Sequence, residues 1–255
     1  MCGRFAIISS PEAIRRLFGY SDTPNFPPRY NVAPTQPIPT VMQVEATRRF
    51  RLMRWGLIPA WAKDPAKVGL LINARSETLN ERPAFRNAMR YRRCLIPADG
   101  YYEWPETGPR KRPLFVYPAR GGPMAFAGLA ETWTGPNGEE MDTVAIVTTA
   151  AARDLASFHP RMPAVIHPDA FDLWLNVRAA DADVASSLLI PTRVGEFRWH
   201  EVSSAVNRHT NDDASLIEPL TDEQRAAEDA ANSIAPQNAT KSRAKPADDG
   251  QGSLF

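Results

Sequence analysis

The sequence predicts an α+β fold with a mostly antiparallel sheet that curves or closes on itself. Short runs of β-forming residues recur along the chain, and Pro, Gly or Asn separates most of them. The expected helices are fewer and short, and strands do not alternate with long helices as they do in a parallel sheet. With 255 residues and 43% hydrophobic content, the chain can form one large or two small domains with a substantial core.

Each element is expected from a local signal. Apolar and β-branched runs place the strands at residues 4–8, 38–44, 50–55, 93–96, 100–104, 114–117, 125–131, 143–149 and 197–202. A helix over residues 11–18 is predicted because Ser10 can cap it and Pro11 occupies its first position. Further helices are expected over residues 84–91, 151–158 and 169–177, the last with an apolar stripe of Phe171, Trp174 and Leu175.

The composition changes near residue 221. From there on the chain is rich in small and polar residues, and it has no large apolar residue between Ile234 and Leu254. Such a segment buries too little surface to offset the entropy of ordering, so residues 221–255 are expected to be a disordered tail behind a folded domain of residues 1–220. Six acidic and four basic residues give the tail a charge of −2, which leaves +3 on the domain. A mildly basic domain is compatible with nucleic acid but does not require it.

Several classes of protein are excluded by composition. No apolar run approaches the roughly 18 residues of a membrane span, and the N-terminus lacks the features of a secretory signal. Cys2 and Cys94 are too few for a disulfide scaffold, and the four histidines form no close cluster with them. We therefore expect a cytoplasmic protein with no membrane partner, metal or cofactor.

Cys2 is the most informative position. Removal of Met1 would give it a free α-amine next to its thiol, with pKa values of about 8 and about 8.5. Such an aminothiol condenses with an aldehyde, because the amine forms an imine and the thiol then closes a five-membered thiazolidine ring. The alternative is that Cys2 is an incidental residue of the first strand. Cys94 is expected to be a small buried apolar residue.

Three polar residues could assist Cys2, and each has a structural alternative. Glu103 lies between aromatic residues, where a carboxyl group can have a raised pKa and transfer protons, or can simply face outward. His159 follows an expected helix and precedes a proline, so its imidazole is either aimed at a site or caps that helix. Asn73 follows an apolar run and could present its amide to a hydroxyl group or satisfy a turn.

Arginines beside aromatic and apolar residues suit a nucleic acid. Guanidinium groups bind phosphates, while indole rings stack on bases. The residues in question are Arg4, Arg54 with Trp55, Trp61, Arg75, and Arg161 with Met162. Two arginine runs, at residues 48–51 and 90–93, extend this track or form solvated faces.

A set of motifs resembles one known family. The motifs are Cys2-Gly3-Arg4-Phe5, Arg29-Tyr30-Asn31-Val32-Ala33-Pro34, Arg54-Trp55-Gly56-Leu57-Ile58-Pro59, Ile72-Asn73-Ala74-Arg75-Ser76-Glu77-Thr78, Gly100-Tyr101-Tyr102-Glu103-Trp104 and His159-Pro160-Arg161-Met162-Pro163. Over about residues 2–207 the chain resembles the SOS response-associated peptidase (SRAP) family, the abasic-site processing proteins. The resemblance implies a curved, barrel-like β core that binds single-stranded DNA containing abasic sites and forms a covalent crosslink through the N-terminal cysteine.

The same resemblance implies roles for individual residues. Cys2 is the nucleophile, Asn73 holds the opened deoxyribose, and Glu103 and His159 move protons for imine formation, ring closure and reversal. Arg4, Arg75 and Arg161 contact phosphates. The DNA path is lined by Asn31, Pro34, Trp61, Trp104 and Met162. Ala62 departs from the pattern, because some bacterial members have a second tryptophan after Trp61.

Two side activities follow from this chemistry and from the family's name. An imine that fails to close its ring can undergo β-elimination, so a lyase activity is expected. The name implies a peptidase activity, for example removal of Met1 by the protein itself, although ordinary methionine trimming would suffice.

Two alternatives come from other classes of protein. Class II glutamine amidotransferases also begin Met-Cys-Gly and use the free α-amine as a base, but Arg4-Phe5 and the motifs of Asn73, Glu103 and His159 do not fit them. A non-catalytic single-strand binding module would use only the arginines and aromatic residues. Replacing Cys2 by Ala would leave such a module unimpaired.

The end of the tail carries a separate signal. Gln251, Leu254 and Phe255 are similar to the peptide by which bacterial proteins dock on the DNA sliding clamp, although Gly252 stands where that motif favours leucine. A disordered tether with two apolar anchors is a workable binding mode, and chance is the alternative. We therefore expect a clamp partner and association with the nucleoid when DNA is damaged.

Overall fold

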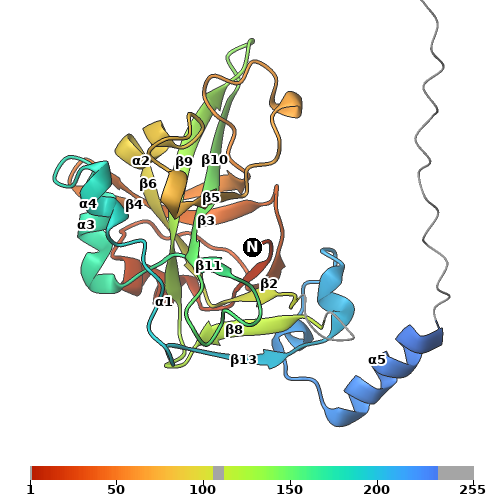
Figure 1. Cartoon of the computed structure of the whole chain (residues 1–255). Coiled ribbons are helices and arrows are strands. Elements are labelled where there is room, and N and C mark those ends of the chain that lie inside the picture. Colours follow the sequence, from red (N-terminus) through yellow and green to blue (C-terminus); the bar gives the residue numbers. More distant parts are fainter. Residues whose placement is uncertain (1, 106–111, 235–255) are drawn as a thin grey trace, which may run out of the picture. The chain divides into compact units, whose positions relative to one another are not determined.

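The computed structural model of the chain describes residues 2–105 and 112–234 (Figure 1). The chain divides into two compact units, one of residues 1–220 and one that begins at Thr221. The first unit contains two β-sheets and a few short helices, which confirms the predicted α+β class.

The elements of regular structure are short. The strands are β1 (Phe5–Ile7), β2 (Arg29–Val32), β3 (Pro37–Val44), β4 (Thr47–Trp55), β5 (Asn73–Arg75), β6 (Arg93–Ala98), β7 (Gly100–Glu103), β8 (Leu114–Pro118), β9 (Met124–Thr134), β10 (Glu140–Ala150), β11 (Arg161–Pro163), β12 (Val165–Ile166) and β13 (Phe197–Glu201). The α-helices are α1 (Pro11–Phe18), α2 (Arg86–Tyr91), α3 (Phe171–Leu175), α4 (Ala182–Ser186) and α5 (Asp222–Ile234). Single 3-10 turns are η1 (Pro65–Lys67), η2 (Ser76–Thr78), η3 (Pro168–Ala170), η4 (Ser204–Asn207) and η5 (Ala214–Ile217).

Five strands of the larger sheet close into a barrel. Hydrogen bonding runs from β10 through β4, β3, β6 and β9 and returns to β10. Only the β10–β4 pairing in this ring is parallel, with Val144 opposite Trp55. Gly128 lets β9 approach β6 closely, because a Cβ at that position would lie 2.6 Å from the Sγ of Cys94. The closed ring confirms the predicted barrel-like β core.

The smaller sheet carries the N-terminus. Its order is β13-β8-β7-β1-β2, and every neighbouring pair is antiparallel. Phe5 in β1 lies opposite Tyr101 of β7 on one side and Val32 of β2 on the other. Its ring also contacts Trp55 and Phe126 of the barrel, at centroid distances of 5.2 and 5.9 Å. The N-terminal strand therefore packs its side chains against the barrel.

Strand β10 holds four other strands, because each of its two edges pairs with two partners in succession. One edge pairs with β4 and then β5, and the other pairs with β9 and then β11. Thr148 thus lies between Arg75 of β5 and Pro163 of β11. Figure 1 shows β5 and β11 beside β10. The motifs of Asn73 and of His159 are far apart in the sequence, and their short strands β5 and β11 both pair with β10.

The helix predicted over residues 11–18 is confirmed as α1. The Ser10 hydroxyl accepts a hydrogen bond from Ala13 N at 3.2 Å, and Gly19 ends the helix with a φ of 69°. The helix expected from residue 84 begins at Arg86, and the one expected over 169–177 is a 3-10 turn followed by α3.

The helix predicted over residues 151–158 is wrong, because this segment is the loop between β10 and β11. Ala151 N donates to Pro160 O at 2.9 Å, so the two strands pair up to the ends of the loop. Inside it, Ala152 N donates to the Met162 sulfur at 3.3 Å. A loop closed at both ends has separate turns rather than the consecutive hydrogen bonds of a helix.

The expected disorder from residue 221 is wrong for Asp222–Ile234, which form α5. Thr221 Oγ1 accepts a hydrogen bond from Gln224 N at 3.2 Å, and Gln224 Oε1 accepts one from Thr221 N at 3.0 Å. This reciprocal cap, the acidic first turn and several alanines favour a helix even though the segment has little apolar surface. Residues 235–255 lie outside the described part of the chain.

Candidate functional site at the N-terminal cysteine

Cys2 lies three residues before the first strand, β1, and is fully buried. Its thiol is 3.9 Å from the carbonyl oxygen of Arg4. Burial raises the pKa of the Cys2 thiol far above its usual value, and the negative charge of Glu103 raises it further. The resting sulfur is therefore a thiol, and its use as a nucleophile requires a base.

Asn73 joins the two sheets at this point. Its Nδ2 donates to the carbonyl oxygen of Cys2 at 2.8 Å, while its backbone pairs with Ile146 of β10. Its Oδ1 is buried and accepts no hydrogen bond within the described residues. The amide thus fixes the main chain of Cys2 and presents an acceptor to a donor group.

Glu103 is at the end of β7, and 5% of it is exposed. The ladder between β1 and β7 brings it close to the N-terminus, because Tyr102 N donates to Arg4 O at 3.0 Å and Glu103 follows Tyr102. Burial raises the pKa of Glu103 to about 7. The carboxyl group can therefore both donate and accept a proton near neutral pH, and its predicted outward-facing alternative is wrong.

His159 lies in the loop before β11 and does not cap a helix. Its Nδ1 accepts a hydrogen bond from Arg161 N at 3.0 Å and is 3.1 Å from Arg161 O. A neutral ring can accept from the N–H group, with its proton on Nε2, and a protonated ring can donate to the carbonyl oxygen. The loop thus supports both protonation states of the imidazole.

The expected phosphate ligands differ in how they are engaged. Arg75 is exposed and makes no ion pair or side-chain hydrogen bond within the described residues. Arg4 Nη1 donates to Asn31 Oδ1 at 2.7 Å and to Val206 O at 2.9 Å, and burial lowers the pKa of Arg4. Arg161 forms two hydrogen bonds with Glu77 and is 14% exposed as a side chain. Arg75 is the arginine of this set that is open to solvent.

Two residues expected along a DNA path are inside the protein. Asn31 is fully buried, and its Nδ2 donates to the carbonyl oxygens of Val206, Arg208 and Asn211. Met162 is also buried, and its sulfur accepts a hydrogen bond from Ala152 N at 3.3 Å. In this structure Asn31 positions Arg4, and Met162 is a core residue.

The remaining expected contacts are closer to the surface. Trp61 is 62% exposed, which suits a stacking surface, and Pro34 is half-buried. The indole N–H of Trp104, also half-buried, donates to Asn207 Oδ1 at 2.8 Å. Its ring lies beside that of Tyr102, at a centroid distance of 6.4 Å.

The arginine runs serve structure in part. Arg93 is buried and donates to the carbonyl oxygens of Met89, Trp174, Asn176 and Ala180. Arg48 pairs with Asp172 at 2.6 Å. Arg93 is therefore unavailable to a nucleic acid, contrary to the suggestion that its run extends the DNA track. Cys94 is buried as predicted.

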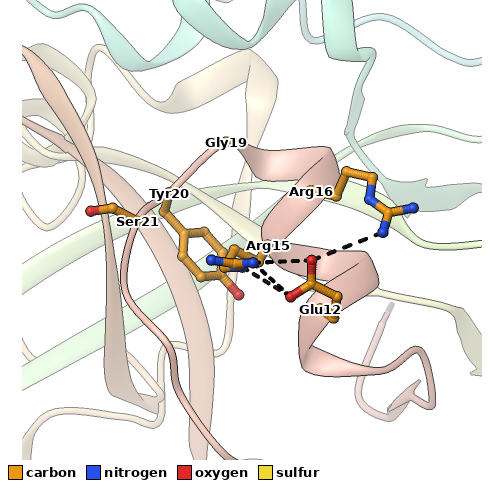
Figure 2. A pocket seen from close by; sticks show the side chains of 6 residues that line it. All are labelled: Glu12, Arg15, Arg16, Gly19, Tyr20 and Ser21. Atoms are coloured by element: carbon orange, nitrogen blue, oxygen red, sulfur yellow. Dashed lines mark hydrogen bonds and ion pairs between the residues drawn. The ribbon is translucent and has the colours of Figure 1, made fainter.

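A surface pocket of about 410 Å³ lies at α1, away from these residues (Figure 2). It is lined by Glu12, Arg15, Arg16, Gly19, Tyr20 and Ser21. Glu12 pairs with Arg15 at 2.8 Å and with Arg16 at 3.9 Å, so both arginines of the pocket already have a carboxylate partner. The chemistry-bearing residues are instead around Cys2.

Within residues 2–105 and 112–234, no group of three His, Cys, Asp or Glu side chains could hold a metal ion. None of the helices in this part of the chain combines the length and apolar character needed to cross a bilayer.

Residues 1–209 match the family model described as SOS response associated peptidase (SRAP). The abasic site processing protein YoqW of Bacillus subtilis is 40% identical over 223 residues, which cover 86% of this chain and 99% of YoqW. The abasic site processing protein YedK of Escherichia coli is 33% identical, and the match covers 86% of this chain and 100% of YedK. The abasic site processing protein HMCES of Gallus gallus is 30% identical, and the match covers 86% of this chain and 78% of HMCES.

Solved structures show a similar fold. A crystal structure of a protein from Bacteroides thetaiotaomicron has a TM-score of 0.77 at 23% identity and covers 86% of this chain and 100% of that protein. A crystal structure of a protein from Bordetella bronchiseptica has a TM-score of 0.69 at 25% identity and covers 79% of this chain and 100% of that protein.

Proposed function

We propose that this protein processes abasic sites in single-stranded DNA through a covalent link to Cys2. The premise is that the chain belongs to the SOS response associated peptidase family. Relatives with up to 40% identity are named abasic site processing proteins, which supports the choice of lesion. The observation that carries the proposal is the surroundings of Cys2. Asn73 holds its carbonyl oxygen at 2.8 Å, and Glu103 is a buried acid whose charge acts on the thiol.

The first step would be formation of an imine. Removal of Met1 leaves a free α-amine on Cys2, and its neutral nitrogen adds to the aldehyde carbon of the opened deoxyribose. The carbinolamine oxygen takes a proton and leaves as water. Glu103 is suited to supply that proton, because its pKa of about 7 leaves a large protonated fraction near neutral pH.

The second step would be closure of the ring. The thiol sulfur adds to the carbon of the protonated imine, the thiol proton passes to a carboxylate, and the nitrogen keeps its N–H proton and becomes neutral. Glu103 is again the acceptor, since it regains its charge after the first proton transfer. The product is a thiazolidine, one water is released overall, and nothing is oxidised or reduced. Converting the aldehyde into this ring removes the electrophile that would otherwise lead to strand cleavage.

Asn73 and His159 would act on the sugar. The unpartnered Oδ1 of Asn73 can accept a hydrogen bond from a hydroxyl of the opened deoxyribose. His159 can carry a proton in either direction, because its Nδ1 faces both the N–H and the C=O of Arg161. The same groups would serve reversal of the link.

The DNA strand would be held by the surrounding arginines and aromatic rings. Exposed Arg75 is suited to bind a phosphate directly, and Trp61 and Trp104 are suited to stack on bases. Arg4 and Arg161 would contribute positive charge near the strand while donating most of their hydrogen bonds within the protein.

Two minor activities belong to the same proposal. If ring closure is slow, the imine can lose the 3′ phosphate by β-elimination, which would appear as a lyase activity. The protein would also be able to remove its own Met1, with Glu103 as the group that assists peptide hydrolysis. Mass spectrometry of the Glu103→Gln variant would test the latter, because self-processing predicts that this variant retains Met1.

The clamp partner stays a prediction from Gln251, Leu254 and Phe255, which lie outside the described residues. Deletion of residues 251–255 should abolish binding to a purified bacterial sliding clamp if the motif is used. Unchanged binding would exclude it.

The proposal is tested by incubating the mature protein with single-stranded DNA that carries one abasic site and separating the products on a denaturing gel. We expect a slowly migrating, heat-stable species with the wild type and none with Cys2→Ala. DNA binding without this species would favour the non-catalytic module, and an absence of DNA binding would lead to glutaminase assays.

A further inference from the structure

The side chain of Arg161 crosses β10 and joins the two strands at its edges. Arg161 belongs to β11, on one edge of β10, whereas Glu77 lies in η2, which follows β5 on the other edge. Nη1 of Arg161 donates to Glu77 Oε1 at 2.9 Å, and Nη2 donates to Glu77 Oε2 at 3.0 Å. Between them, Thr148 of β10 accepts a hydrogen bond from Nη2 at its carbonyl oxygen at 2.6 Å.

This arrangement uses nearly all the donors of the guanidinium group. Nε of Arg161 is directed at Thr148 Oγ1 at 3.3 Å, so four of its five N–H groups have partners within the protein. Arg161 lowers the pKa of Glu77 through the same hydrogen bonds, which keeps the carboxylate charged. The pair is two-pronged and charge-assisted, a geometry that fixes orientation as well as adding energy.

The fixed arginine determines the backbone on which His159 depends. Arg161 N is the donor to His159 Nδ1, and Arg161 O is the acceptor that a protonated ring would use. On the other edge, Glu77 lies four residues after Asn73, with exposed Arg75 between them. One ion pair thus connects the strand of Asn73 to the loop of His159.

We propose that Glu77 is a positioning residue, which acts through Arg161 to hold the His159 loop in register with the strand of Asn73. The inference rests on the proposed function and adds a residue that is neither a phosphate ligand nor a proton carrier. Glu77 itself is 52% exposed as a side chain, so the role lies in its contact with Arg161 and not in a core contact.

A competing idea makes a different prediction. If Glu77 only occupied Arg161 until a phosphate displaced it, removing its charge would strengthen DNA binding and leave the chemical step unchanged. If Glu77 positions the loop, removing its charge slows the chemical step and leaves DNA affinity nearly unchanged.

The test uses the full-length mature protein and the variants Glu77→Gln and Glu77→Asp. Single-turnover crosslinking is measured at saturating abasic single-stranded DNA, and DNA affinity is measured with an unreactive strand that carries a reduced abasic site. Glu81→Gln is the matched control, because it removes the same charge from an exposed residue four positions away. Thermal unfolding confirms that each variant is folded.

We expect Glu77→Gln to reduce the crosslinking rate about threefold to tenfold, which is the scale of one charge-assisted contact, with DNA affinity within about twofold. Glu77→Asp, which keeps the charge but cannot reach both nitrogens, should be intermediate, and Glu81→Gln should match the wild type. An unchanged rate for both Glu77 variants, or tighter DNA binding alone, would overturn the inference. Absence of crosslinking by the wild type would instead refute the proposed function.

Discussion

At the scale of residues, burial has opposite consequences for Cys2 and Glu103: it suppresses the nucleophilic thiolate but brings the carboxyl group into a useful range for proton transfer. The same desolvation raises both pKa values, so the thiol keeps its proton and the carboxyl group titrates near neutral pH. The burial that raises the pKa of Glu103 thus makes this acid suited to proton transfer near neutral pH. The two groups are close enough that the charge of Glu103 acts on the Cys2 thiol.

The stability of the protein should report the raised pKa of Glu103. Between pH 4.5 and about 7 the folded state keeps a proton that the unfolded state has released, so rising pH lowers the free energy of unfolding. The loss is up to about 3 kcal/mol for a shift of this size. Glu103→Gln does not titrate, so its stability relative to the wild type should increase over this range. Urea unfolding of both proteins at pH 5 and pH 8 measures this difference, and parallel pH dependences would contradict it.

Asn73 should affect the reaction more than the fold. Asn73→Ala removes the hydrogen bond to Cys2 O and the acceptor for the sugar, so the crosslinking rate should fall roughly tenfold to a hundredfold. Stability should fall by only about 1 kcal/mol, the usual net value of one hydrogen bond. Single-turnover rates and thermal unfolding measure the two effects. A rate equal to the wild type would remove Asn73 from the mechanism.

Motif residues could be predicted from the sequence, but their exposure could not. Cys2, Asn73 and Glu103 were expected near one another and are linked by a hydrogen bond and by charge. Asn31 and Met162 were expected to face DNA and are buried, because motif membership does not reveal which side of a strand a residue occupies. Glu77 belongs to the motif of Asn73, but its partner Arg161 is 84 residues away, so only the fold reveals the pair.

At the scale of elements, the sequence predicts nine of the described strands and misses β2, β5, β11 and β12. β10 and β9 have enough apolar and β-branched residues to be recognised alone. β5 and β11 have three residues each, and they form strands because the two edges of β10 offer them hydrogen-bonding partners. The missed strands include β5, which carries Asn73, and β11, which follows the loop that carries His159.

Arg93 should be essential to the element it holds. It ties the segment from Trp174 to Ala180 to β6 and α2 through four carbonyl oxygens. Arg93→Met would leave these buried acceptors unpaired, so we expect a loss of about 3–5 kcal/mol in the free energy of unfolding. Arg90→Met, at an exposed position nearby, is the matched control. Denaturant unfolding measures both, and equal stability of the two variants would contradict this role of Arg93.

At the scale of the whole molecule, the unit of residues 1–220 contains every residue assigned to the chemistry. The family match also ends within it, at residue 209. The helix α5 in the second unit was not predicted, because the expectation of disorder rested on the scarcity of large apolar residues. That criterion takes no account of a good N-terminal cap, such as the one formed by Thr221 and Gln224.

Removal of residues 221–255 should therefore leave the crosslinking rate within about twofold of the full-length value, since no reacting group is lost. The comparison is a single-turnover assay of the two proteins on the same abasic strand. A loss of tenfold or more in the truncated protein, with its fold intact, would assign the second unit a part in the reaction.

The central claim is that both the amine and the sulfur of Cys2 react, and Cys2→Ser tests it most directly. The variant keeps the α-amine, so it should form an imine with an abasic strand but no heat-stable thiazolidine. On a denaturing gel, its crosslink should appear only after borohydride reduction, whereas the wild-type crosslink should survive heating without it. A heat-stable, unreduced crosslink formed equally well by Cys2→Ser would contradict the account.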